Sequence, residues 1–224
     1  MRDVIFDVRI ELIYYQLLFI FKSLSMEEIR MDRADIKAEA RYNLGNNIFG
    51  EKWLLAAVAV LVTGAITSAV AFTGIGPLIL TGPLTVAMSG AFLKASREDR
   101  SIDLGEMLTN AFTKDFVRNM ILSIVVGVFV FLWSLLFIVP GIIKMYSYAM
   151  ANYIAADHPE YDWKDCMKAS EDMMNGRKME LFLLDLSFIG WCILGAFAFG
   201  VGELLVAPYM FQARTVFYRR IVNG

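Results

Sequence analysis

The sequence predicts an all-α protein, a polytopic membrane helix bundle. Hydrophobic residues make up 58% of the 224 positions, and this share exceeds the roughly 45–50% that is typical of soluble domains. Charged residues, 20% of the chain, are spread unevenly, with apolar stretches of about 20 residues between segments dense in Lys and Arg. Short segments rich in Gly and Pro divide the apolar stretches into pairs. Together these features predict six transmembrane helices arranged as three hairpins.

The predicted crossings are the long apolar runs with little or no charge. At about 1.5 Å per residue, a helix of about 20 residues spans the hydrocarbon core of a bilayer. The fourth and sixth runs are short and contain a charged residue each, which makes them marginal as crossings. The runs are Trp53 to Phe72, Pro77 to Leu93, Asn119 to Val139, Ile142 to Ala156, Leu181 to Phe199 and Leu204 to Tyr218.

The connections between the runs predict the orientation. Helix-breaking turns close the three hairpins, at Gly74 to Pro77, Pro140 to Gly141 and Gly200 to Gly202. The remaining connections are longer and basic: Lys22 to Lys52 contains six Lys or Arg, Lys94 to Arg118 five, and Lys164 to Lys178 four. Because basic loops stay on the cytoplasmic side, we expect both termini and all long loops to be cytoplasmic.

A short amphipathic segment precedes each hairpin. Its apolar residues recur at spacings of three and four, which places them on one face of a helix and suits a helix on the cytoplasmic face of the membrane. Asp162 is placed to cap the third of these helices, and Asn175-Gly176 to end it. The apolar positions are Ile36, Ala40 and Leu44; Leu104, Leu108, Ala111 and Phe112; and Trp163, Cys166, Met167, Ser170 and Met174.

The first 30 residues do not fit this plan. The apolar run Leu12 to Phe21 is too short to cross a bilayer, and acidic residues precede it. We therefore expect residues 1–30 to be a peripheral extension, or sequence upstream of a start at Met26 or Met31. Residues 31–224 form the predicted six-helix membrane domain.

Several blocks of sequence resemble a known family. They are "RADIKAEAR", "LFIVPGIIKMYSYAMANYIAADHPE", "ASEDMMNGRK", "LFLLDLSFIGW" and "APYMFQARTVFY". In this order and spacing they resemble a family of uncharacterised bacterial multi-pass membrane proteins, a domain of unknown function, over residues 31–224. The resemblance implies an integral protein of the bacterial cytoplasmic membrane, and it brings no activity, cofactor or catalytic residue.

Asp185 lies within the fifth apolar run and is the main candidate for a functional polar group. It is about six residues, or roughly 9 Å, from the cytoplasmic end of that run, where an unpaired carboxylate is costly. If the third turn centres near Gly200, residues of the two helices lie level when their numbers sum to about 400, as those of Asp185 and Arg214 do. We therefore predict an ion pair between Asp185 and Arg214.

Weaker candidates lie on the fourth and sixth runs. Lys144 and Glu203 each follow an outward turn, so they could pair, although we expect each simply to reach water. Tyr148 and Asn152, with Tyr146 and Tyr153, could line a polar path along the fourth helix. Tyrosines also pack in bundles and mark interfaces, so these positions are equally compatible with a structural role.

Other function classes find little support in the sequence. A net charge of −2 does not indicate a nucleic-acid-binding surface. The single histidine, His158, provides no pairing with a nucleophile and no metal cluster, and Cys166 and Cys192 lie in segments of different depth. We therefore expect no catalytic residue, no metal, no cofactor and no enzymatic activity.

The sequence favours a non-catalytic membrane scaffold or interaction protein. Its basic loops could contact anionic lipids, and stripes of small residues could pack against a second copy or another membrane protein. The alternative is a small transporter or channel that uses Asp185 and Arg214 in an inward-facing polar cavity. A structural pair that fixes helix register is the competing explanation for the two charges.

Overall fold

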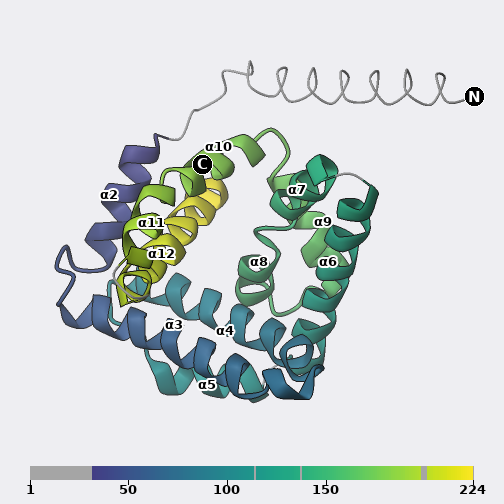
Figure 1. Ribbon diagram of the computed structural model, residues 1–224, viewed down its shortest axis with the longest axis horizontal. Coiled ribbons are helices and arrows are strands. Elements are labelled where there is room, and N and C mark those ends of the chain that lie inside the picture. Colours follow the sequence, from purple (N-terminus) through teal and green to yellow (C-terminus); the bar gives the residue numbers. More distant parts are fainter. Residues whose placement is uncertain (1–31, 114, 137, 198–200, 224) are drawn as a thin grey trace, which may run out of the picture. The chain divides into compact units, whose positions relative to one another are not determined.

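All regular secondary structure in the described part of the chain is helical. The computed structural model describes residues 32–113, 115–136, 138–197 and 201–223, and these belong to one unit, Asp32–Gly224. Figure 1 shows α3 and α4 side by side, with α6 to α9 on one side of them and α2 with α10 to α12 on the other. The helices are α2 (Arg33–Asn43), α3 (Glu51–Ala69), the short η1 (Ala71–Thr73), α4 (Gly76–Glu98), α5 (Leu104–Thr113), α6 (Phe116–Leu136), α7 (Ile138–Ser147), α8 (Ala151–Asp157), α9 (Trp163–Met173), α10 (Lys178–Leu186), α11 (Ile189–Phe197) and α12 (Val201–Asn223). Residues 1–30, the predicted extension, lie outside the described residues.

The first predicted hairpin is present as α3 and α4. Gly74 ends η1 with a φ of 72°, a conformation that suits glycine because it has no Cβ. The hydroxyl of Thr73 accepts a hydrogen bond from the amide of Gly76 at 2.8 Å, and Pro77 follows in the first turn of α4, where its missing N–H costs nothing. The chain therefore reverses where the sequence predicts.

The second hairpin differs from the prediction in the position of its turn. Pro140 and Gly141 lie inside the first turns of α7 instead of between two helices, because α6 already ends at Leu136 and α7 begins at Ile138. A Cβ on Gly141 would lie within 3 Å of Ser134 on α6. The glycine is thus needed for close packing of the two helices.

The predicted fourth crossing is interrupted. α7 ends at Ser147 and α8 starts at Ala151, so neither helix is long enough to span a bilayer. The buried hydroxyl of Ser170 on α9 donates to Ser147 O at 2.8 Å and accepts from Met150 N at 3.2 Å. One side chain thus pairs two backbone groups that the interruption would otherwise leave buried and unpaired.

The fifth predicted crossing is also divided, into α10 and α11. α10 ends at Leu186, and the Ser187 hydroxyl donates to Leu184 O at 2.6 Å, a local bond that competes with helix continuation. The sixth predicted crossing lies within α12, which continues through Pro208. Of the turn predicted at Gly200 to Gly202, Gly200 lies outside the described residues, and Val201 and Gly202 form the start of α12.

The three amphipathic helices are present as α2, α5 and α9. On α2, Ile36, Ala40 and Leu44 are all buried, and Asp162 caps α9 by accepting from Trp163 N at 2.7 Å. Gly176, with a φ of 78°, follows the end of α9. Their apolar faces pack against neighbouring helices, since α2 contacts α12 and α9 contacts α6 and α8. Burial within the protein therefore accounts for most of these apolar positions, and Phe112 on α5, which is 48% exposed, is an exception.

Among the described residues, three helices are long and apolar enough to cross a membrane: Glu51–Thr73, Gly76–Glu98 and Phe116–Leu135. In the most apolar 18-residue stretch of the first and third of these helices, only 17% and 11% of the residues are buried, against 50% in the second helix. α4 is thus the central helix, while α3 and α6 present apolar side chains outward.

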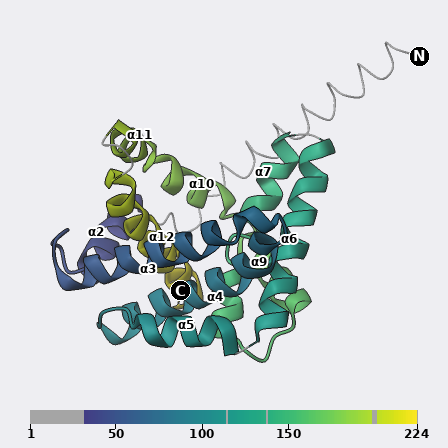
Figure 2. The same ribbon diagram turned by 60° about the horizontal axis from the view of Figure 1, so that its bottom comes forward.

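The helices are not arranged as parallel crossings. In Figures 1 and 2, α6 runs at a large angle to α3 and α4. The indole Nε1 of Trp53, at the start of α3, donates to Leu205 O near the start of α12 at 3.1 Å. The predicted topology placed these two residues at opposite membrane surfaces. α12 therefore packs across the beginning of α3 and does not run alongside its whole length.

Candidate functional site

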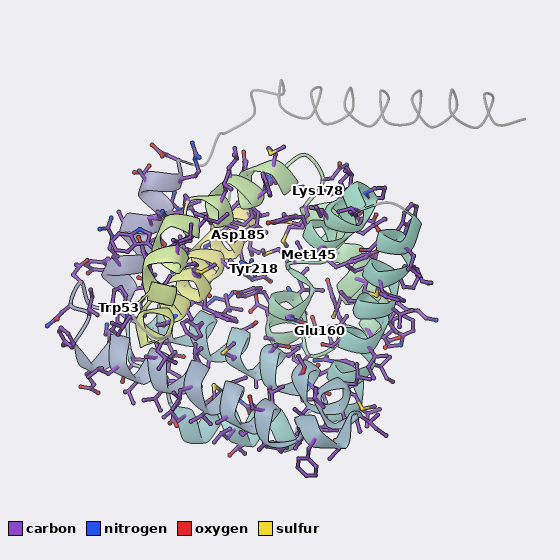
Figure 3. The ribbon with its side chains drawn as sticks, viewed as in Figure 1. Trp53, Met145, Glu160, Lys178, Asp185 and Tyr218 are labelled. Atoms are coloured by element: carbon purple, nitrogen blue, oxygen red, sulfur yellow. The ribbon has the colours of Figure 1, made fainter. Side chains whose placement is uncertain are left out.

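Asp185 and Arg214 form the ion pair that the sequence predicts. Arg214 Nε donates to Asp185 Oδ1 at 3.0 Å, and Arg214 Nη2 donates to Oδ2 at 2.8 Å. The contact joins α10 to α12, and Figure 3 marks Asp185 where the two helices meet. Two parallel bonds of this kind fix both the distance and the orientation of the charged groups.

Tyr146 on α7 is a second hydrogen-bond partner of the Asp185 carboxylate. Its hydroxyl donates to Asp185 Oδ2 at 3.1 Å. The ring of Phe182, one turn before Asp185 on α10, packs edge-on against the Tyr146 ring with 5.8 Å between centroids. Asp185 therefore accepts three hydrogen bonds from two helices, and its side chain is 14% exposed, against 40% for Arg214.

The rule that level residues have numbers summing to about 400 also holds for the contact between Cys192 and Met210, nearer the turn. The thiol of Cys192 on α11 donates to the Met210 sulfur on α12 at 3.8 Å. The register therefore continues from α10 into α11, although α10 ends between them. This is why counting outward from the turn located Arg214 correctly even though the fifth helix is not continuous.

Lys144 has a different partner from the one considered in the sequence. Its Nζ donates to Glu171 Oε1 on α9 at 2.6 Å, and its side chain is 24% exposed. The expectation that Lys144 simply reaches water at the outer surface is therefore wrong. The prediction assumes a continuous fourth crossing, whereas α7 is short and packs against α9. Glu203 lies on α12, and its side chain is outside the described residues.

Tyr148 and Asn152 lie apart from the Asp185 pair. Tyr148 is buried between α7 and α8, and its ring centre is 5.6 Å from Lys144 Nζ. Asn152 is partly buried on α8. Of the tyrosines on the predicted fourth crossing, the one that reaches Asp185 is thus Tyr146.

A second polar cluster, which the sequence did not indicate, joins α4, α8 and α12. Asp157 Oδ2 accepts from Arg97 Nη2 at 2.7 Å and from the Tyr218 hydroxyl at 3.2 Å. The Arg97 guanidinium, hydrogen-bonded to the carboxylate, lowers the pKa of Asp157 below its usual value. Because these residues come from three helices distant in sequence, only the tertiary packing brings them together.

Further ion pairs lie at the same end of the α3–α4 hairpin as Arg97. Lys52, in the first turn of α3, contacts Asp99 at 2.7 Å just after α4. Arg220, near the end of α12, donates to Glu39 on α2 at 2.8 Å. The opposite end of the hairpin is apolar, with Phe72 88% exposed and Ile75 64% exposed. The hairpin therefore has one charged end and one apolar end.

No group of three or more His, Cys, Asp and Glu within the described ranges is placed to hold a metal ion. Burial raises the pKa of the Cys166 thiol on α9 to about 11, which keeps it protonated at neutral pH.

A comparison with known families places this chain in a family. The model of a family described as proteins of unknown function, DUF975, matches residues 26–151 and 136–223. The chain belongs to the DUF975 family. Comparison with curated proteins and with solved structures gave no match. The DUF975 match includes Tyr146, Asp185 and Arg214, so the whole polar site lies in the family domain.

Proposed function

We propose that this DUF975 chain is an integral membrane protein of the bacterial cytoplasmic membrane and acts there as a non-catalytic scaffold or interaction protein. Support for the membrane comes from α3 and α6. Apolar side chains such as Leu61 on α3 and Phe131 and Leu132 on α6 are 49%, 62% and 57% exposed. Apolar side chains exposed to this degree along two helices are costly in water and favourable in lipid or against another membrane protein.

The charged end of the α3–α4 hairpin supports a cytoplasmic orientation. Lys52, Arg97 and Arg220 all lie at that end, and basic residues favour the cytoplasmic side of a membrane. In this orientation both termini are cytoplasmic and Phe72 lies at or near the opposite surface. Each of the three cations has an acidic partner, which limits how many remain for contact with lipid headgroups.

The single observation that carries the non-catalytic role is the set of three protein donors that Asp185 accepts from. Two donors from Arg214 and one from Tyr146 occupy its carboxylate oxygens. A carboxylate that serves as a relay or a binding group must exchange partners, whereas one held by three protein donors connects helices. Asp185 therefore acts as a structural link between α7, α10 and α12.

A second function, a small transporter or channel, is favoured by one observation. The Arg214 side chain is 40% exposed although it is paired with Asp185. A solute that reached Arg214 from the cytoplasmic side could compete for Asp185.

Reconstitution distinguishes the two functions. Proteoliposomes containing a trapped pH-sensitive dye are compared with protein-free vesicles under a potassium diffusion potential, and osmotic swelling is recorded with KCl and with glycerol. A scaffold leaves both signals at the protein-free level, for the wild type and for Asp185→Asn. Flux in the wild type that disappears in Asp185→Asn would instead establish the transporter.

If the protein is a scaffold, a protein partner should contact the exposed face of α6. A photoreactive residue in place of Leu132, on the exposed face of α6, should give a reproducible protein adduct in native membranes. The same residue in place of Leu122, which is fully buried on α6, serves as the control and should give none. Only lipid adducts at Leu132 would contradict a protein partner on this face.

A further inference from the structure

A cavity of about 530 Å³ lies among α2, α3, α11 and α12. Its volume falls within the roughly 300–1,000 Å³ of typical small-molecule sites. The lining has two chemically different parts. The cationic part is Lys37 and Arg41 on α2, and the apolar and aromatic part includes Trp53, Trp191, Leu205 and Tyr209.

The cationic part belongs to a stripe along α2. Arg33, Lys37 and Arg41 are spaced by four residues, so they share one face of the helix. Among the described residues none forms an ion pair with any of the three, and Glu39 on the same helix is directed to Arg220 and Arg219. Burial and the charges of Arg41 and Arg33 lower the pKa of Lys37. An anion at this position would relieve the repulsion within the stripe.

Hydrogen bonds hold the two parts of the lining together. The Tyr209 hydroxyl donates to Lys37 O at 3.2 Å, and Lys37 Nζ donates to Ser187 O at 3.0 Å beside the Phe188 ring. Trp53, marked in Figure 3, donates to Leu205 O and packs against Tyr209 with 5.8 Å between ring centroids. The cavity is therefore preformed, so a ligand would not have to order its walls.

The apolar part indicates an amphiphile, because a small soluble anion would leave it unused. Trp191 is 55% exposed at the cavity and Ile48 is 45% exposed. Trp53 lies in the first turns of α3, one of the candidate membrane spans. Tryptophan and basic side chains at the end of a span are typical of the membrane–water interface, where headgroups and acyl chains meet.

We propose that this cavity binds one anionic phospholipid, with the phosphate between Lys37 and Arg41 and an acyl chain along Trp191 and Leu205. The proposal rests on the membrane location argued above and names a specific partner for it. It places the lipid contact in the cavity beside α2, where Lys37 and Arg41 form no ion pair with a described acidic residue, whereas Lys52, Arg97 and Arg220 are each paired with one.

Native mass spectrometry of the purified, delipidated full chain tests the proposal. The protein is incubated with equal amounts of phosphatidylglycerol and phosphatidylcholine that have the same acyl chains. The wild type should retain phosphatidylglycerol preferentially. Arg41→Gln should lower that preference about fivefold, the effect of one basic residue near an anionic headgroup, and Lys37→Gln with Arg41→Gln should lower it further. The variant with Lys164→Gln and Lys168→Gln, which removes two exposed charges from α9, should behave as the wild type.

Three outcomes would overturn the proposal. The wild type could retain both lipids equally, or Arg41→Gln could leave the preference unchanged. Inorganic phosphate could displace the bound lipid at millimolar concentration, which would indicate a soluble anion site. Arg41→Gln is informative even if Lys37→Gln misfolds, because the Arg41 side chain is exposed and does not hold the Ser187 carbonyl.

The membrane location is checked separately by alkaline carbonate extraction of native membranes. Release of the chain would refute the membrane location itself. Retention of the chain, combined with equal binding of the two lipids, would refute the lipid site alone.

Discussion

The guanidinium of Arg214 donates to both carboxylate oxygens of Asp185, 29 positions earlier in the chain, at 3.0 and 2.8 Å. This pair connects α10 to α12, and the Tyr146 hydroxyl connects the same carboxylate to α7. Three helices that are separate in sequence therefore meet at one charged group. Their packing depends on that group retaining its charge and its partners.

Asp185→Asn should destabilise the protein without changing solute flux. The substitution leaves the Arg214 charge without its counterion, and hydrogen bonds to charged groups contribute about 1.5–3 kcal/mol each. Because Arg214 is partly exposed, we expect a loss near the lower end, about 2 kcal/mol in the free energy of unfolding. Thermal unfolding in detergent measures this loss.

A double-mutant cycle separates the pair from its surroundings. Arg214→Gln, combined with Asp185→Asn, should lose less stability than the sum of the two single changes, with a coupling of about 0.5–3 kcal/mol. Tyr146→Phe is the matched control, since it removes one hydrogen bond and retains the ion pair. Additive losses from the two charged positions would show that the pair does not stabilise the fold.

This pair could be predicted from the sequence because the relative depth of two residues in a hairpin depends only on the turn position and the rise of a helix. The register between the two arms of an antiparallel hairpin is set by its turn. It is unchanged although the fifth crossing is divided into α10 and α11. The partner of Lys144 could not be found in this way. Glu171 lies on α9, and its approach to α7 depends on the interruption after Ser147, which an apolar sequence run does not reveal.

Ser170→Ala should be more damaging than a serine-to-alanine change normally is. The Ser170 hydroxyl pairs Ser147 O and Met150 N, both at the interruption between α7 and α8. A buried group left unpaired costs about 1–3 kcal/mol, so we expect a loss of about 2 kcal/mol or more.

Ser134→Ala is the matched control for Ser170→Ala. The Ser134 hydroxyl is exposed and donates only within its own helix, to Val130 O, and its loss should change stability by less than about 0.5 kcal/mol. Equal shifts in unfolding temperature for the two variants would show that Ser170 does not support the interruption.

The amphipathic segments show both what periodicity can predict and what it leaves open. Spacings of three and four identified the buried faces of α2 and α9, including Ile36, Ala40 and Cys166. The same spacings suited a headgroup layer equally well. Periodicity shows that a face is withdrawn from water, and only the tertiary contacts show that other helices cover it.

Gly82→Ala should destabilise the crossing of α4 and α6. A Cβ at this position would lie 2.4 Å from Asn119 O and 2.8 Å from the Ser123 hydroxyl. Overpacking of this kind costs about 1–3 kcal/mol, which exceeds the gain of about 1 kcal/mol from replacing glycine within a helix. Gly64→Ala and Gly127→Ala are controls, because a Cβ there meets nothing within 4 Å. These two should be neutral or stabilising, and a stabilised Gly82→Ala would contradict the close approach.

Asp157 should make the stability of the fold sensitive to acid. Its hydrogen bonds from Arg97 and Tyr218 favour the charged form, so the pKa of Asp157 is lower in the folded chain than in the unfolded chain. The resulting stabilisation is fully present above the unfolded value of about 3.9 and is lost as the pH falls through the lower folded value. The unfolding temperature of the wild type should therefore decline below about pH 4.

Asp157→Asn should be less stable than the wild type at neutral pH, and the difference between the two should narrow as the pH is lowered. A constant difference between pH 7 and pH 3 would show that the carboxylate is not held in its charged form by Arg97.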